Sequence, residues 1–217
     1  MSRVCPTSIL AFAAFLGAAT ISPATAQSID FGDAGLGQPP PRFSFARTGS
    51  GPQGRWEVVR DDSASGGKAL AQLSADTTDY RFPLAIYDPV DATDAEISAR
   101  FKPVSGKVDR AGGVVLRYQN PDNYYVARAN ALEGNVRFYR VVRGKREQLA
   151  SADTKIATGQ WHTLALRAER DRFAVSLDGR ALTTTKDGTF RAAGKVGLWT
   201  KTDSVTHFDK IEIKVLR

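Results

Sequence analysis

The chain has 217 residues, with 30 Lys or Arg against 23 Asp or Glu, and a formal net charge of +7. The basic residues are scattered and do not gather in one segment, which argues against a nucleic-acid partner. The positive charge fits simple solubility, or attraction to acidic glycans and anionic envelope surfaces. Since Cys5 is the one cysteine, the chain cannot form an internal disulfide.

The first 26 residues have the pattern of a secretory signal peptide. Arg3 precedes an almost unbroken apolar run over 9–21, and Ala24-Thr25-Ala26 has the small residues of a cleavage site. This run of 13 residues is shorter than the roughly 20 that a transmembrane helix needs. We therefore expect cleavage before Gln27 and a secreted or periplasmic protein without a membrane span.

Residues 27–42 are rich in glycine and proline and include three consecutive prolines, which is typical of a linker or a loosely attached leader. From residue 43 to residue 217 there is no further low-complexity tract and no repeat of solenoid length. The sequence therefore predicts one folded domain over 43–217, preceded by the leader and the signal peptide.

Apolar and polar residues alternate with a period of two along much of this domain, which is the pattern of half-buried strands. The segments 95–101, 162–168 and 173–177 show it most clearly, and Asp178-Gly179 predicts a two-residue hairpin turn. Further strands are expected near residues 56–60, 68–73, 82–87, 113–119, 124–130, 135–142, 145–151, 180–185, 194–200 and 205–216. No window has sustained helical periodicity, so the sequence predicts an all-β, antiparallel β-sandwich.

Five motifs occur in order along the predicted strands. They are Tyr80-Arg81-Phe82-Pro83-Leu84-Ala85; Gly112-Gly113-Val114-Val115-Leu116-Arg117-Tyr118-Gln119 with Asn123-Tyr124-Tyr125; Gly159-Gln160-Trp161-His162-Thr163-Leu164; Gly194-Lys195-Val196-Gly197-Leu198-Trp199-Thr200; and Phe208-Asp209. In these five motifs the chain resembles the concanavalin A-like lectin/glucanase jelly rolls over about residues 55–217. More narrowly, it resembles bacterial exported domains grouped with laminin-G-like modules and with 3-keto-disaccharide hydrolase domains. The resemblance implies a single jelly roll but no one activity, because function in this superfamily depends on the site that the fold presents.

Sugar binding needs aromatic faces to stack on and planar polar groups to fix hydroxyls. The candidates are Arg117, Tyr125, Arg128, Tyr139 and Trp199. In the alternation, Arg117, Tyr139 and Trp199 oppose apolar neighbours, so we expect them on the face turned away from the core. If that face is concave, the candidates would line one groove. The alternative is that the Tyr and Trp side chains pack in the core or against neighbouring strands.

Two kinds of hydrolytic chemistry are considered. Asp94 and Glu96 share a strand face, but the Glu-x-Asp-x-Glu core of the glucanases is missing, so a laminarinase-type mechanism is rejected. A 3-keto-glycoside hydrolase, which the resemblance implies, would need a base to remove the proton next to the ketone. Histidine suits this task near neutral pH, and His207 is the candidate. Many concanavalin A-like domains hold a structural calcium ion through a late-strand aspartate, and by position Asp209 matches it.

Three functions remain open on the sequence alone. The first is an exported carbohydrate-binding or interaction module with a glycan or sugar ligand on the concave sheet. The second is an enzyme of the 3-keto-glycoside hydrolase type. The third is a structural or adhesion domain of the cell envelope.

Overall fold

A computed structural model describes Met1 and residues 26–216, so most of the expected signal peptide lies outside the described residues. The regular elements of the described part are all strands. They are β1 (Ala26–Ile29), β2 (Phe43–Gly49), β3 (Trp56–Arg60), β4 (Lys68–Gln72), β5 (Arg81–Ala92), β6 (Ala95–Ser105), β7 (Ala111–Asn120), β8 (Asn123–Asn130), β9 (Asn135–Val142), β10 (Lys145–Asp153), β11 (His162–Glu169), β12 (Arg172–Leu177), β13 (Arg180–Lys186), β14 (Gly194–Thr200) and β15 (Val205–Val215).

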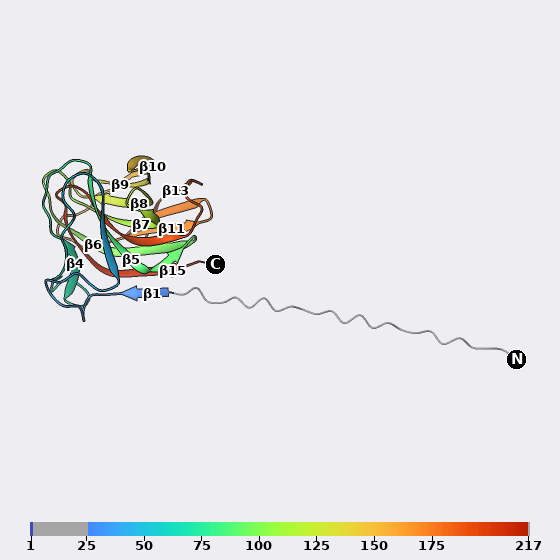
Figure 1. Ribbon diagram of the computed structural model, residues 1–217, viewed down its shortest axis with the longest axis horizontal. Coiled ribbons are helices and arrows are strands. Elements are labelled where there is room, and N and C mark those ends of the chain that lie inside the picture. The colour runs from blue at the N-terminus through green and yellow to red at the C-terminus, as the bar shows by residue number, and fades with distance from the viewer. Residues whose placement is uncertain (2–25, 217) are drawn as a thin grey trace.

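The strands form two antiparallel sheets that lie face to face (Figure 1). Sheet A has the order β13-β12-β11-β6-β15-β4-β3, with β1 also pairing β15. Sheet B has the order β10-β9-β8-β7-β14-β5-β2. The predicted all-β, antiparallel sandwich is confirmed. No helix in the described part of the chain has the length and apolar character needed to cross a membrane.

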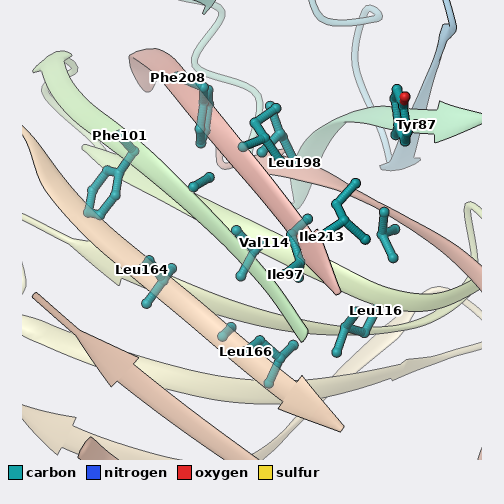
Figure 2. Packing of buried hydrophobic residues seen from close by; sticks show 14 of the residues in the cluster. Tyr87, Ile97, Phe101, Val114, Leu116, Leu164, Leu166, Leu198, Phe208 and Ile213 are labelled. Atoms are coloured by element: carbon teal, nitrogen blue, oxygen red, sulfur yellow. The ribbon is translucent and has the colours of Figure 1, made fainter. Parts of the chain in front are cut away.

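The core lies between the sheets because the alternating apolar side chains of both sheets point into the same layer. In Figure 2, Val114 and Leu198 of sheet B lie near Ile97 and Ile213 of sheet A. Each of these side chains is at most 1% exposed. Burying an aliphatic side chain of this size contributes about 1.5–3 kcal/mol relative to leaving it in water. This shared layer holds the two sheets together.

The segment expected to be a leader over 27–42 is partly built into the sandwich. Residues 26–29 form β1, which pairs with residues 211–214 of β15. Phe31 is only 2% exposed and belongs to the core. The physical reason is that β4 pairs only with residues 206–208 of β15, so β1 covers the part of that edge that β4 leaves free. β2 is also a strand that the sequence reading did not assign.

Sheet B is curled across its outer face. Thr48 on the edge strand β2 donates a hydrogen bond to the carbonyl of Pro121 in the β7–β8 turn. Tyr80, just before β5, accepts a hydrogen bond of 2.7 Å from the backbone N–H of Arg146 at the start of β10. The first contact crosses β5 and β14, and the second crosses β14, β7, β8 and β9, so sheet B curls over itself and its outer face is concave. The concave face contains a second apolar cluster of Phe82, Leu84, Ile86, Ala111, Val115, Tyr124, Val126, Tyr139, Val141 and Trp199.

Candidate ligand-binding site

Three of the five predicted sugar-binding residues lie together on the concave face of sheet B. Trp199 on β14 lies opposite Gly113 on β7, and Gly113 lies opposite Arg128 on β8. Arg128 in turn lies opposite Arg137 on β9, two residues before Tyr139 on the same face. Gly113 leaves room for this row, since a Cβ there would lie 2.8 Å from the Ala127 carbonyl and 3.2 Å from the Trp199 ring. Tyr139 and Trp199 thus lie on the face opposite the core, as their alternation predicts, and Arg128 lies there with them.

Trp199, however, is the floor of this face and not an exposed platform. Its side chain is fully buried, and its ring stacks on Phe82 with centroids 5.2 Å apart. The Arg146 guanidinium lies over the same rings, with its Cζ 4.8 Å from the centroid of Phe82 and 5.8 Å from that of Trp199. A sugar can therefore reach the Trp199 ring only if the Arg146 side chain moves.

Three arginines surround the phenol of Tyr139, and we call Arg128, Arg137, Arg146 and Tyr139 the arginine patch. The Arg146 Cζ lies 4.3 Å from the centroid of the Tyr139 ring, a favourable cation–π distance. An Nη2 N–H of Arg128 points at the Tyr139 hydroxyl oxygen at 3.4 Å. The arginine patch combines cationic hydrogen-bond donors with an aromatic ring on one concave surface.

Only part of this donor capacity is used within the protein. Arg128 donates to Asn135 at 2.6 Å and to Glu133 at 2.7 Å. Arg137 shares Glu133 at 3.5 Å. Among the residues that the structure describes, the Nε of Arg128, the Nε of Arg137 and the Nη1 of Arg146 are buried and have no hydrogen-bond partner. Such groups normally find a partner, so these three donors are unsatisfied hydrogen-bonding capacity within the arginine patch.

The electrostatics of the patch are visible in the pKa of Tyr139. Burial of the phenol raises this pKa, because the phenolate is poorly solvated there. The charges of Arg128 and Arg146, with hydrogen bonding to Arg137 and Arg128, outweigh burial and lower the pKa below its ordinary value of 10. The net direction indicates that the arginine patch has a positive potential.

Arg117 does not belong to this site, and its predicted position on the outward face is wrong. The ladder between β7 and β8 shifts register between Leu116 and Asn120, and Arg117 takes a left-handed backbone with φ of 49°. This bulge interrupts the alternation on which the prediction rested. The side chain is 2% exposed and donates to the carbonyls of Thr93 at 2.6 Å and Phe190 at 2.8 Å. It is a structural tie.

Tyr125 also lies outside the site, because it faces the core between the sheets. Its ring centroid is 4.4 Å from that of Phe173, and the side chain is fully buried. Its hydroxyl donates a hydrogen bond to Asp187 and accepts one of 3.1 Å from the backbone N–H of Phe190. Burial, followed by the nearby Asp187 carboxylate, raises the pKa of Tyr125 to about 12. Tyr125 therefore packs in the core, which was the alternative to sugar binding for this side chain.

The candidate base His207 lies on the outer face of sheet A, since its neighbour Phe208 points into the core. Its Nδ1 is 2.7 Å from Asp61 Oδ2, and Lys102 contacts the same carboxylate. Burial opposes ionisation of Asp61, but hydrogen bonds from Lys102, a nearby serine and His207 bring its pKa well below the usual range. This ion-paired cluster and the arginine patch lie on opposite outer faces of the sandwich, so the structure does not bring His207 to the predicted sugar-binding residues.

The carboxylate of Asp209, the candidate calcium ligand, has hydrogen-bond donors on one of its two oxygens. Its Oδ2 accepts hydrogen bonds from the backbone N–H of Ser65 at 2.8 Å and from Arg100 at 2.9 Å. A calcium ion needs several oxygen ligands, whereas here an arginine cation and an N–H group face the carboxylate. The described residues contain no group of three or more His, Cys, Asp or Glu side chains that could hold a metal. Calcium binding at Asp209 stays an untested prediction.

Sequence reasoning missed Arg137 and Arg146, although both left a signal. Arg137 is two residues before Tyr139 and therefore shares its face by the strand period. Arg143 and Gly144 form a two-residue turn with φ values of 49° and 73°, which sets Arg146 opposite Val141. An expected hairpin at that turn would have brought Arg146 to the same face.

A separate cavity of about 540 Å³ lies beside the N-terminal segment. Its walls include the aromatic rings of Phe31, Phe43 and Tyr87, with the Arg42 Cζ 5.1 Å from the centroid of Tyr87. Two carboxylates, Asp30 and Asp33, also line it, which makes it a competing place for a small polar ligand.

Family models and curated proteins give no match to the chain. Solved structures do match. The carbohydrate-binding module CBM66 from Bacillus subtilis is 22% identical with a TM-score of 0.60, over 77% of this chain and 94% of that chain. Domain 4 of AbnA, an extracellular arabinanase from Geobacillus stearothermophilus in complex with arabinotriose, is 16% identical with a TM-score of 0.59, over 88% and 93%. A Bacillus subtilis protein of unknown function with a galectin-like fold is 11% identical with a TM-score of 0.55, over 80% and 90%.

At these identities the likeness shows the fold. Together with the two antiparallel sheets, it shows that the chain is a jelly roll of the concanavalin A-like class, as its sequence motifs indicated. The fold class is shared by many activities, so the function has to be argued from the site.

Proposed function

We propose that this protein is an exported carbohydrate-binding module that holds its sugar at the arginine patch. The observation that supports the proposal most is the set of buried, unpartnered N–H groups of Arg128, Arg137 and Arg146, counted over the described residues. They lie beside the ring of Tyr139 on one concave face. Sugars are recognised by such a combination, because their hydroxyls accept hydrogen bonds while their C–H faces contact aromatic rings.

The fold and the sequence lend further support. Two of the similar solved structures are named as a carbohydrate-binding module and as an arabinanase domain holding arabinotriose. The expected signal peptide would bring the protein to the periplasm or the cell exterior, where polysaccharides are found.

The two other functions have less support. A 3-keto-glycoside hydrolase would need a base beside the bound sugar, and His207 lies on the opposite face of the sandwich from the arginine patch. An adhesion or structural domain needs no small-molecule site, which would leave the unpartnered arginine N–H groups without a role.

The test is binding of the exported protein to a panel of soluble polysaccharides by affinity electrophoresis, followed by isothermal titration. Arg137→Ala is the informative variant because this side chain is one-third exposed, at 35%, so its removal leaves the core intact. Losing a charge-assisted hydrogen bond of about 1.5–3 kcal/mol should weaken binding at least about tenfold. Arg172→Ala, on the exposed face of β12, is the matched control and should bind normally.

Three other results would overturn the proposal. Failure to bind any polysaccharide would favour the adhesion domain. Loss of binding in Arg42→Ala but not in Arg137→Ala would move the site to the cavity at the N-terminal segment. Release of free sugar from a 3-keto-glucoside, lost in His207→Ala, would favour the hydrolase.

A further inference from the structure

We propose that the sugar held at the arginine patch is acidic, with a carboxylate that pairs with the guanidinium of Arg146. The inference rests on the proposed function and deepens it by naming the class of glycan. It follows from the position of Arg146, from the charges around it and from the geometry that a guanidinium prefers.

Contacts of both its backbone and its guanidinium fix the position of Arg146. Its backbone N–H donates to the hydroxyl of Tyr80 at 2.7 Å. Its guanidinium lies over Tyr139, Phe82 and Trp199, with Cζ-to-centroid distances of 4.3, 4.8 and 5.8 Å. The rings neutralise no charge, so the cation is placed without being compensated.

The carboxylates near the patch are already engaged. Glu133 pairs with Arg128 at 2.7 Å and with Arg137 at 3.5 Å. Glu147, the residue after Arg146, turns to the other face of sheet B and pairs with Arg140 at 2.8 Å. Hydrogen bonding to Tyr139 is the main cause that raises the pKa of Arg137, and the charge of Asp153 contributes to the same shift. Within the described part of the chain, Arg146 belongs to no ion pair.

Arg146 is half-buried, and a guanidinium donor that is shielded from water without an acceptor favours the approach of an anion. The Nη1 of Arg146 is buried and has no acceptor among the described residues. A carboxylate can take two parallel hydrogen bonds from a guanidinium, which fixes both distance and orientation. A neutral sugar would supply hydroxyl acceptors but would leave the charge of Arg146 unbalanced.

Two properties of the molecule support the same conclusion. The arginines lower the pKa of Tyr139 despite its burial, so the patch favours negative charge on a group placed there. The chain also has a net charge of +7, which would attract a polyanion from a distance.

The test compares two forms of one polymer, polygalacturonate and its fully methyl-esterified derivative, which share a backbone and differ in charge. We expect at least about tenfold tighter binding of the acid form, the range of a charge-assisted hydrogen bond. The preference should shrink as salt is raised, because ions screen the attraction.

Variants assign the preference to one side chain. Arg146→Gln keeps a polar side chain but removes the charge, and should reduce the preference for the acid form to near equality. Arg146→Lys should retain part of it, because lysine supplies the charge without the planar fork. Arg172→Gln, exposed on β12, makes the same change of charge elsewhere and should retain the full preference. Unfolding curves confirm that each variant is folded.

The outcomes separate this inference from the proposed function. Equal binding of the acid and ester forms would overturn the acidic class and leave a carbohydrate-binding module. Equal effects of Arg146→Gln and Arg172→Gln would attribute the preference to net charge and overturn the role of Arg146. If the protein binds dextran sulfate but not polygalacturonate, the proposal that the ligand's anionic group is a carboxylate would be overturned. Absence of binding to every glycan would overturn the proposed function as well.

Discussion

The arginine side chains of this protein differ in whether their N–H donors have partners within the protein. Arg81 is fully buried and donates to the carbonyls of Pro52 at 2.8 Å and Thr202 at 2.7 Å. Arg117 is tied to carbonyls in the same way. Both guanidinium groups donate to several backbone carbonyls and to one side chain, Ser74 or Asp94, and so hold loops together, whereas Arg146 retains a free donor above aromatic rings. Burial alone therefore does not distinguish these arginines, whereas the partners of their N–H groups do.

Replacing Arg117 tests this distinction. Arg117→Met keeps an unbranched side chain but leaves the carbonyls of Thr93 and Phe190 without their donor. We expect the free energy of unfolding to fall by at least about 2 kcal/mol, since each buried unsatisfied group has a desolvation cost. Urea unfolding measures the loss, with Arg172→Met as an exposed control. Polysaccharide affinity of the folded variant should stay unchanged. A stable Arg117→Met protein that no longer binds would instead place Arg117 in the site.

At the scale of the elements, strand β15 depends on a segment that looks like a linker in the sequence. β1 pairs with residues 211–214 of β15, next to the stretch where β4 pairs with residues 206–208. Cleavage before Gln27, which the sequence predicts, would leave this pairing to the first residues of the mature chain. The segment thus covers an edge that would otherwise be open to another strand.

Truncating Phe31 tests how firmly this segment is attached. The side chain is 2% exposed and lies 6.2 Å from Phe43, centroid to centroid. Phe31→Ala should lower the free energy of unfolding by about 3–4 kcal/mol, because it removes buried area and leaves a cavity. Leu36→Ala, at a side chain that is 49% exposed, is the control and should have little effect. Equal stability of both variants in urea would mean that the segment is only a loose leader.

The elements also show how far the sequence could predict the structure. The alternation of apolar and polar residues over 95–101 and 162–168 predicts these two strands correctly, because it depends only on which face of a strand is buried. The Asp178-Gly179 turn is local too, with positive φ at both residues. The alternation places Arg117 on the wrong side because the bulge that contains this residue arises from pairing with β8 and has no local signal. For the same reason β1, whose pairing partner lies at the far end of the chain, was read as part of a leader.

For the whole molecule, the alternation predicted the sandwich and placed Tyr139 and Trp199 on the face opposite the core, where the structure also has Arg128. The depth at which each side chain lies was not predictable. Trp199 is buried because opposite corners of sheet B meet and bring Arg146 over it, and those contacts join residues far apart in the sequence. Closure of the sheet therefore decides which members of the candidate site a ligand can touch.

The contact between Tyr80 and Arg146 is the part of this closure that bears on the site. Tyr80→Phe removes the hydroxyl that accepts the Arg146 N–H at 2.7 Å but keeps the ring against Phe82, 4.8 Å away between centroids. A hydrogen bond is worth about 1 kcal/mol net, so amide exchange at Arg146 should accelerate about fivefold while global stability changes little. Because the guanidinium of Arg146 is positioned through this backbone, affinity for polygalacturonate should fall in the same variant.

Tyr118→Phe is the matched control on the same face, since its hydroxyl bonds to no described residue and its ring still lies 6.0 Å from Tyr124. Unchanged exchange at Arg146 in Tyr80→Phe would mean that the corners of sheet B are held together by Thr48 and Pro121 without help from Tyr80.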